Sequence, residues 1–272
     1  MNPFTYQRPE TGDAAVQAAA THSAKFLGGG TILVDLMRYG VESPTALIDV
    51  NHLHLTEVTR ASSGTTTIGA SVRNSDLANH PVIREHYPLL SHALLSGASP
   101  QLRNMATTAG NLLQRTRCYY FMDTAFPACN KRNPGSGCAA IKGFNRIHAI
   151  LGASDSCIAT NPSDMNVAMA ALNASVHVEG PGGKRTIAFH DFHLLPGNTP
   201  NIEPTAAVRR ARPLAGPRRL RPAHRQASLV VRDPREQVGV GDRARGRGIA
   251  DHGVARKLRA GRQLGLRGGG SR

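Results

Sequence analysis

The fold class that this sequence predicts is α+β, and three observations support that prediction. Stretches with helical spacing and stretches with alternating or continuous apolar character follow one another along residues 1–204. Glycine and proline clusters separate these stretches, as they do at turns. Hydrophobic residues make up 40% of the 272 residues, which is enough for a globular core. No apolar run approaches the roughly 18–20 residues needed to cross a bilayer, so we expect no membrane span.

The elements before residue 100 are short and clearly separated. The expected strands are Lys25–Leu27, the buried Ala46–Val50, and Thr65–Val72, in which β-branched residues alternate. The expected helices are the Ala-rich Asp13–Thr21, Leu33–Arg38 with its helical spacing, a short helix capped by Asn74 or Ser75, and the apolar Pro88–Ser96.

A second group of elements follows residue 160. We expect a helix at Asp164–Leu172 that begins after Ser163 as its N-cap. The strands Ala174–Glu179 and Arg185–Phe189 flank a Pro-Gly-Gly turn and predict a hairpin. Between the two apolar helices, residues 112–160 hold every cysteine and show little periodicity.

A run of three glycines, Gly28 to Gly30, follows a strand and precedes a helix. Glycines lack the Cβ that would block a phosphate, and free backbone N–H groups point into such a loop. The spacing is neither G-x-G-x-x-G nor G-x-x-x-x-G-K, so a Rossmann site and a P-loop are both unsupported. From these residues alone, a phosphate-binding loop and an ordinary glycine-rich turn both remain open.

Two further segments place small and polar residues at turns. The run TTAGN at residues 107–111 would let backbone approach a planar or phosphorylated ligand, with hydroxyl and amide groups for hydrogen bonds. The run NPSD at residues 161–164 puts a carboxylate at a helix start, where plain helix capping is the alternative. We find no nucleophile elbow, triad or H-x-x-x-H pair, and therefore assign no catalytic residue.

Taken in this order, three segments resemble the FAD-binding subunits of the molybdenum hydroxylases, a family that includes xanthine and carbon monoxide dehydrogenases. They are GGGTIL, QLRNMATTAGN and PSDMNVAMAALNASVHVEGPGGKRTI. The resemblance covers about residues 3–204. It implies two α+β subdomains of the vanillyl-alcohol-oxidase (PCMH) type that hold an extended FAD between them.

The resemblance also implies roles for individual residues. The loop that would wrap the FAD pyrophosphate comprises Phe26, Leu27, Gly28, Gly29, Gly30, Thr31, Ile32, Leu33 and Val34. The turn residues that would contact the cofactor are Thr107, Thr108, Gly110 and Asn111, and Asp164 would bind a polar part of it. The family commonly has Asn or Asp where this chain has Ile32, so we expect one side-chain hydrogen bond to be missing.

The four cysteines have the spacing C-x10-C-x8-C-x18-C, at Cys118, Cys129, Cys138 and Cys157. Four thiolates suit a [4Fe–4S] cluster or a Zn site, and disulfides or free thiols are the further alternative. The lack of a C-x-x-C knuckle counts against the common structural Zn sites. Nearby basic residues would either offset the charge of a four-thiolate cluster or form a solvated surface: Arg115, Arg117, Lys131 and Arg132.

The cysteine segment carries a resemblance of its own. The run GNLLQRTRCYYFMDTAFPACNKRNPGSGCAA resembles the flavin subunit of periplasmic aldehyde oxidoreductases of the enterobacterial type. That subgroup carries an additional [4Fe–4S] cluster in an insertion, which here would be residues 112–160. The resemblance implies that all four cysteines are its ligands.

Residues 205–272 differ sharply from the FAD-binding domain expected at 1–204. Residues 1–205 hold 15 Lys/Arg and 14 Asp/Glu, whereas residues 206–272 hold 18 Lys/Arg and 4 Asp/Glu, and 17 of those 18 are Arg. An Arg-rich RNA-binding arm, a solvated linker and a GC-rich gene translated out of frame remain as alternatives. We expect this tail to be disordered, with Leu229–Arg232 as its one short candidate strand. The C-terminal α+β domain usual in the family has no recognisable counterpart beyond about Pro204.

The expected function is that of an FAD- and [4Fe–4S]-binding electron-transfer subunit in a molybdenum-containing aldehyde or xanthine-type oxidoreductase. The resemblance implies a heterotrimer with a large molybdenum-cofactor subunit and a small subunit with two [2Fe–2S] clusters, and no nucleic acid partner. The alternatives are a basic nucleic-acid-binding protein with a Zn-bound cysteine module, and a non-functional fragment. Residues 1–20 show no secretory signal, so we expect a cytoplasmic location, or a periplasmic one by export with a partner.

Overall fold

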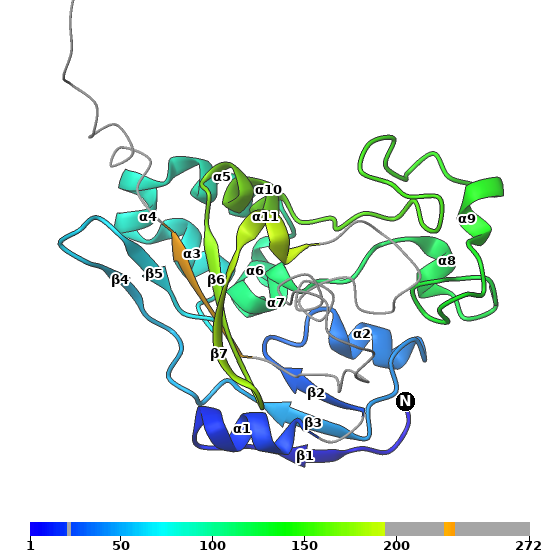
Figure 1. Ribbon diagram of the computed structural model, residues 1–272, viewed down its shortest axis with the longest axis horizontal. Helices are drawn as coiled ribbons and strands as arrows, with labels where there is room; N and C mark the ends of the chain where they lie inside the picture. The colour runs from blue at the N-terminus through cyan, green and yellow to red at the C-terminus, as the bar shows by residue number, and fades with distance from the viewer. Residues whose placement is uncertain (21–22, 194–225, 232–272) are drawn as a thin grey trace, which may run out of the picture. The chain divides into compact units, whose positions relative to one another are not determined.

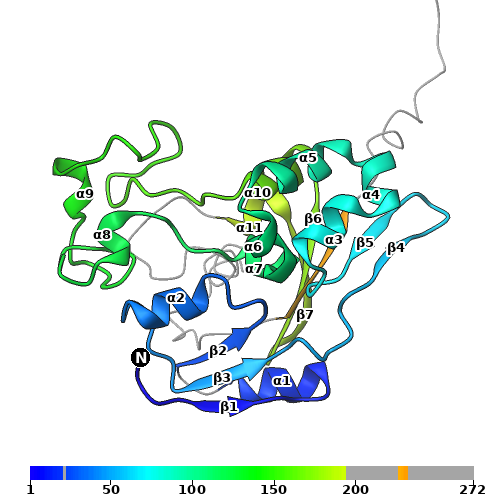
Figure 2. The same cartoon turned by 180° about the vertical axis from the view of Figure 1, so that it is seen from behind.

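The computed structural model describes residues 1–20, 23–193 and 226–231, which build a three-stranded and a five-stranded sheet with helices packed on them (Figure 1 and Figure 2). The mixed helix and strand character that the sequence predicts is confirmed. None of the helices within these described ranges is long and apolar enough to span a membrane.

The smaller sheet is parallel and has the order β1-β3-β2. Its strands are β1 (Thr5–Gln7), β2 (Ala24–Leu27) and β3 (Ala46–Asp49), linked by helices α1 (Gly12–Ala18) and α2 (Leu33–Arg38). All four residues of the central strand β3 are buried. Helix α1 packs on this sheet through small side chains, because Ala15 and Ala19 meet Ala24, Ala46 and Ile48 in one cluster. The sequence therefore predicts this half well, although it missed β1.

The larger sheet is antiparallel and has the order β4-β5-β8-β6-β7. Its strands are β4 (Val58–Arg60), β5 (Thr66–Ile68), β6 (Ser175–Gly180), β7 (Gly183–Ala188) and β8 (Gln226–Val231). The expected hairpin is present, and Gly183, at the start of β7, has a φ of +91°, which suits glycine. Strand β5 is shorter than the expected Thr65–Val72.

Strand β8 lies in the segment expected to be disordered and overlaps its one candidate strand, Leu229–Arg232, so the expected disorder does not hold for residues 226–231. Its backbone pairs with β5 on one side and with β6 on the other. Without it, one edge of each neighbour would lack backbone hydrogen-bond partners, and its own Leu-Val-Val run has high strand propensity. The other parts of the expected tail, residues 205–225 and 232–272, lie outside the described residues.

Seven helices of the described chain cover or flank the larger sheet. They are α3 (Asn74–Asn79), α4 (Pro81–His86), α5 (Pro88–Ser96), α6 (Pro100–Met105), α7 (Thr108–Leu112), α10 (Asp164–Ala171) and α11 (Phe189–Phe192). Proline at the first helical position begins α4, α5 and α6, where its missing N–H costs nothing. The expected cap of α3 is wrong, because Asn74 is the first helical residue and Arg73 occupies the N-cap without a side-chain hydrogen bond.

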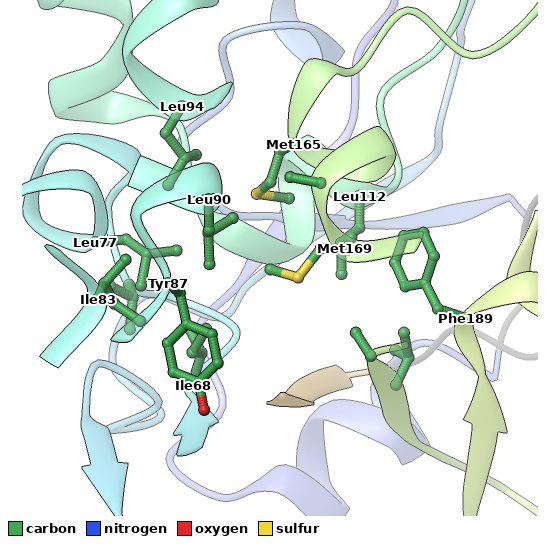
Figure 3. Close-up of a cluster of buried hydrophobic side chains, with 14 of the residues drawn as sticks. Ile68, Leu77, Ile83, Tyr87, Leu90, Leu94, Leu112, Met165, Met169 and Phe189 are labelled. Atoms are coloured by element: carbon green, nitrogen blue, oxygen red, sulfur yellow. The ribbon is translucent and has the colours of Figure 1, made fainter. Parts of the chain in front are cut away.

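The main hydrophobic core lies between these helices and the larger sheet (Figure 3). Fully buried side chains from α4, α5 and α10 converge there, among them Ile83, Leu90, Met165 and Met169, together with Tyr87 between α4 and α5. The TTAGN run, expected as a turn, instead begins α7, with Thr107 as its N-cap and residues 108–111 helical. Leu112 at the end of α7 joins the same core, so this run is anchored by apolar packing.

The cysteine-bearing segment forms a third, smaller core with two four-residue helices, α8 (Tyr119–Met122) and α9 (Ala139–Lys142). In Figure 1 and Figure 2 it lies away from the five-stranded sheet and beside α2. The weak periodicity of residues 112–160 agrees with this structure of short helices and turns.

Candidate functional site

The glycine loop lies between the end of β2 at Leu27 and the start of α2 at Leu33. Its residues are half-buried, and Gly30 has a φ of +72°. Within the described chain, the backbone N–H groups of Gly29, Gly30, Thr31 and Ile32 donate to no backbone acceptor. Four successive unpaired N–H donors in a half-buried loop are suited to the oxygens of a phosphate or pyrophosphate.

At two of these positions only glycine fits, because residues of the α6–α7 turn leave no room for a Cβ. A Cβ on Gly29 would lie 1.9 Å from the carbonyl oxygen of Met105, and one on Gly28 would lie 2.9 Å from Thr107 Oγ1. The loop is therefore pressed against the turn between α6 and α7. The sequence predicted that the missing Cβ makes room for a ligand, whereas at these two positions protein atoms occupy that room.

Two residues that sequence reasoning missed brace this contact. The Asn51 side chain donates to Gly28 O at 3.1 Å and to Asp49 Oδ1 at 2.6 Å. The Arg73 guanidinium donates to Asn51 Oδ1 at 3.2 Å and also to Met105 O. Asn51 follows the central strand of a parallel sheet, and the carboxyl ends of parallel strands are where ligand sites gather. That position is the signal that could have found it.

Asp49, at the end of β3, is a buried carboxylate held by three partners. It accepts hydrogen bonds from the Tyr6 hydroxyl, from the Asn51 backbone N–H at 2.9 Å and from the Asn51 side chain. Burial by itself would raise the pKa of Asp49, but these hydrogen bonds outweigh it and hold the pKa below its usual value. The same hydrogen bond to Asp49 raises the pKa of Tyr6.

The two threonines of the TTAGN run are buried and bonded within the protein. Thr107 Oγ1 accepts from Gly110 N at 3.2 Å and so caps helix α7, while Thr108 Oγ1 donates to Val72 O at 3.0 Å. A Cβ on Gly110 would come within 2.9 Å of Thr107 Oγ1. These residues therefore shape the turn that faces the glycine loop, and the Thr107 hydroxyl lies against Gly28.

The structure joins the TTAGN turn to the start of α10 across the whole cysteine segment. Ser163 Oγ donates to Asn111 Oδ1 at 2.7 Å and accepts from Asn166 N at 3.1 Å as the N-cap of α10. Gln114 Nε2 donates to Asn111 Oδ1 at 2.6 Å. Asp164 is exposed at the first position of α10, where its Oδ2 lies beside Gly97. Of the predicted pair, Ser163 therefore contacts Asn111, and Asp164 lies beside the end of α5.

The four cysteines are free thiols, and their side chains meet in the third core. Cys118, Cys129 and Cys157 are buried, and Cys138 packs against them. Burial raises the pKa of the Cys118 and Cys157 thiols. Among the described residues, no group of three or more His, Cys, Asp or Glu side chains is arranged so that it could hold a metal ion as it stands.

The basic residues around the cysteines have distinct environments. Lys131 is only 6% exposed, and its charge lowers the pKa of Cys157, against the larger effect of burial. Arg132 donates to the carbonyls of Tyr120 and Phe121 at 2.6 and 2.8 Å, which ties α8 to the loop after Cys129. Arg117 is exposed. Of the two alternatives, charge compensation fits Lys131, and a solvated surface fits Arg117.

Helix α2 connects the glycine loop to the cysteine core. Leu36 of α2 is buried in that core, and Ile32, at the N-cap position, packs against it. The departure at Ile32 thus has a structural reason, because its apolar side chain packs where the loop meets the cysteine segment. Glu42 reinforces the link by pairing with Lys25 of β2 at 3.4 Å and with Arg115 at 2.8 Å.

Comparison with known proteins places this arrangement in a family context. Residues 2–212 match the family model described as the FAD binding domain in molybdopterin dehydrogenase. The chain is 57% identical over 205 residues to the aldehyde oxidoreductase FAD-binding subunit PaoB of Escherichia coli K12, a match that covers 75% of this chain and 64% of that protein. It is 33% identical over 111 residues to the carbon monoxide dehydrogenase medium chain of Hydrogenophaga pseudoflava, covering 40% of this chain and 39% of that one.

Solved structures show the same fold at low identity. The reconstituted CO dehydrogenase from Oligotropha carboxidovorans matches 86% of this chain and 61% of its own, with a TM-score of 0.56 at 20% identity. Quinoline 2-oxidoreductase from Pseudomonas putida 86 matches 86% of this chain and 60% of its own, with a TM-score of 0.55 at 18% identity. The chain spans less than two thirds of the length of these relatives.

Proposed function

Because the chain belongs to the family of FAD-binding domains in molybdopterin dehydrogenases, we propose that it is the flavin subunit of a molybdenum-containing aldehyde oxidoreductase and carries a [4Fe–4S] cluster beside FAD. The observation that carries the proposal is helix α2. It begins at a loop in which four N–H groups find no acceptor among the described residues, and its Leu36 is buried in the cluster that holds the cysteines. One short helix therefore connects two candidate redox sites.

The residues present fit FAD. The loop from Phe26 to Val34 would hold the pyrophosphate through the N–H groups of Gly29 to Ile32, with Asn51 and Arg73 fixing the loop against the turn before α7. Thr107, Thr108, Gly110, Asn111 and Asp164 are proposed as further contacts on the FAD side. A PCMH-type arrangement in two subdomains is consistent with one ligand-facing loop on the small sheet and one turn on the helices of the large sheet.

The donor chemistry of the third core fits an iron–sulfur cluster. Cys118, Cys129, Cys138 and Cys157 supply four soft ligands. The buried Lys131 would offset part of the negative charge of four thiolates. The thiols would have to draw closer together than they now stand, which metal binding commonly achieves in small sites.

In this role the protein positions the cofactors and excludes water, and its own residues take no part in bond making. FAD, when bound, accepts electrons singly from clusters and releases them in pairs. The proposed companions are a large molybdenum-cofactor subunit, which would oxidise the aldehyde, and a small [2Fe–2S] subunit. The relative PaoB is named as a subunit of an aldehyde oxidoreductase, which supports the aldehyde class.

The test is the cofactor content of the purified full chain. We expect FAD together with iron and acid-labile sulfide in the ratio of a [4Fe–4S] cluster, which gives a yellow-brown protein. Cys129→Ser should lose the iron and the broad visible absorbance and keep FAD. A colourless protein that holds zinc would overturn the proposal in favour of a zinc module. Full iron content in Cys129→Ser would show that the ligand set is wrong.

A further inference from the structure

Two of the four cysteines lie directly opposite each other on paired backbone. Cys129 and Cys138 form an antiparallel bridge that closes the loop between them. The Ala139 N–H donates to Ala128 O at 2.9 Å, one position outside the pair, which makes the two cysteines a non-hydrogen-bonded pair. In such pairs the Cα atoms are about 4.5 Å apart and the side chains leave the same face. That separation lies within the range of about 4.4–6.8 Å that a disulfide needs.

The loop between the two cysteines is held closed by one buried side chain. Asn130 Oδ1 accepts from Gly135 N at 3.1 Å and from Gly137 N at 2.9 Å, and its Nδ2 donates to Ser156 O at 2.7 Å. Asn130 is only 5% exposed, so these hydrogen bonds are sheltered from competing water. The two thiols therefore face each other across a loop that is already folded, which raises the concentration that each presents to the other.

Burial and backbone pairing distinguish this pair from the other two cysteines. Cys138 is the one cysteine of the four that is not buried, whereas Cys129 is 7% exposed. An oxidant in solution therefore reaches Cys138 first, and Cys129 supplies the second thiol. Cys157 has a bridge of its own to Ser154, so backbone pairing selects Cys129 and Cys138.

We propose that Cys129 and Cys138 are a site of reversible oxidation in the iron-free chain, with a small-molecule disulfide such as oxidised glutathione as the oxidant. The Cys138 thiolate attacks one sulfur of that disulfide, its S–S bond breaks, and one glutathione thiolate leaves. The Cys129 thiolate then attacks Cys138 Sγ, and the second glutathione thiolate leaves as the protein disulfide forms. Two electrons pass from the protein thiols to the glutathione disulfide, and the two thiol protons end on the two released glutathiones.

This oxidation goes beyond the proposed function and does not depend on it, because the thiols are free in this chain. It nevertheless has a consequence for the proposed cluster, since a disulfide would occupy two of the four proposed ligands. Iron can then enter only after the pair is reduced, and a bound cluster protects the pair from oxidation. Pairing also keeps both sulfurs from the irreversible stages of thiol oxidation.

The experiment places the full chain, with its iron removed by a chelator, in glutathione redox buffers. Peptide mapping by mass spectrometry then identifies the disulfide. We expect one disulfide, between Cys129 and Cys138, and we expect Cys118 and Cys157 to remain open to alkylation once the chain is denatured. A disulfide between Cys118 and Cys157, or a mixture of pairings, would overturn the proposal. A glutathione adduct on Cys138 that never resolves into the internal disulfide would also overturn it.

A pair of variants tests whether the folded loop brings the thiols together. Asn130→Ala should lower the equilibrium constant for forming the disulfide at least tenfold, because the loop loses three hydrogen bonds. Asn145→Ala is the matched control, since its Nδ2 donates to Ile141 O, outside this loop, and should leave the constant unchanged. Equal constants for the wild type and Asn130→Ala would contradict the loop geometry.

The iron content of the chain separates this inference from the proposed function. A chain that cannot take up iron but forms the Cys129–Cys138 disulfide would count against the cluster and leave the oxidation site standing. A chain that holds a [4Fe–4S] cluster, and whose iron-free form gives no such disulfide, would leave the proposed function standing and refute the oxidation site.

Discussion

Replacing Gly29 by Ala is the sharpest test of how the glycine loop works. The added Cβ would lie 1.9 Å from Met105 O, and real Cβ atoms essentially never come closer than 3.0 Å to such a neighbour. The loop and the α6–α7 turn must therefore separate by about 1.1 Å, against the hydrogen bonds that Asn51 and Arg73 make across them. Overpacking of this kind costs about 1–3 kcal/mol.

The cost should appear in both stability and FAD affinity. If about 2 kcal/mol of it falls on the FAD-bound form, the Kd for FAD rises about thirtyfold. Flavin fluorescence titration measures that Kd, and thermal unfolding of the flavin-free chain measures the loss of stability. Gly182→Ala is the matched control, since a Cβ there meets nothing within 4 Å. If Gly29→Ala keeps both the wild-type Kd and the wild-type Tm, the packing argument is refuted.

Three further substitutions test the surroundings of the loop. Asn51→Ala removes the donor to Gly28 O and should weaken FAD binding several-fold by titration, because one hydrogen bond contributes about 1 kcal/mol. Asn79→Ala, at an exposed position of α3, should leave FAD binding unchanged. Asp49→Asn should make the free energy of unfolding depend less steeply on pH in acid. The lowered pKa of Asp49 adds stability above about pH 3.9, and this stability is lost as the pH falls through the pKa of Asp49 in the folded protein. An acid unfolding curve as steep as that of the wild type would contradict this. Ser163→Ala should lower the free energy of unfolding in urea by about 1–2 kcal/mol through loss of the α10 cap and the Asn111 contact, and an unchanged midpoint would argue against that role.

The elements that the sequence predicts well are those with a local cause. Helix α2 has the expected bounds Leu33–Arg38, and α10 begins after the Ser163 cap as expected. The elements that it missed or only partly predicted depend on distant partners. Strand β1, which was missed, is exposed on all three residues and pairs with β3. Strand β8 overlaps the candidate strand Leu229–Arg232, and its pairing with β5 and β6 could not be predicted from the sequence. Such strands have no internal periodicity from which the sequence could predict their pairing.

The same division applies to the candidate site. The glycine loop and the TTAGN turn are visible as composition, and the structure brings them together. The bracing by Arg73 and Asn51 is not visible, because it joins residues 22 positions apart through side-chain geometry. The environment of Ile32 was equally hidden, since its partner is the cysteine core. Sequence patterns locate segments, and long-range contacts decide which side chains face one another.

From the position of α2 we expect the two proposed cofactor sites to be thermodynamically linked. The first turn of α2 belongs to the loop proposed to hold FAD, and its buried Leu36 belongs to the core of cysteines. Anything that orders this helix from one end lowers the entropy still to be lost at the other. By reciprocity, the coupling free energy is the same in both directions. A chain loaded with iron should therefore bind flavin more tightly than an iron-free chain, and flavin should raise the affinity for iron by the same factor.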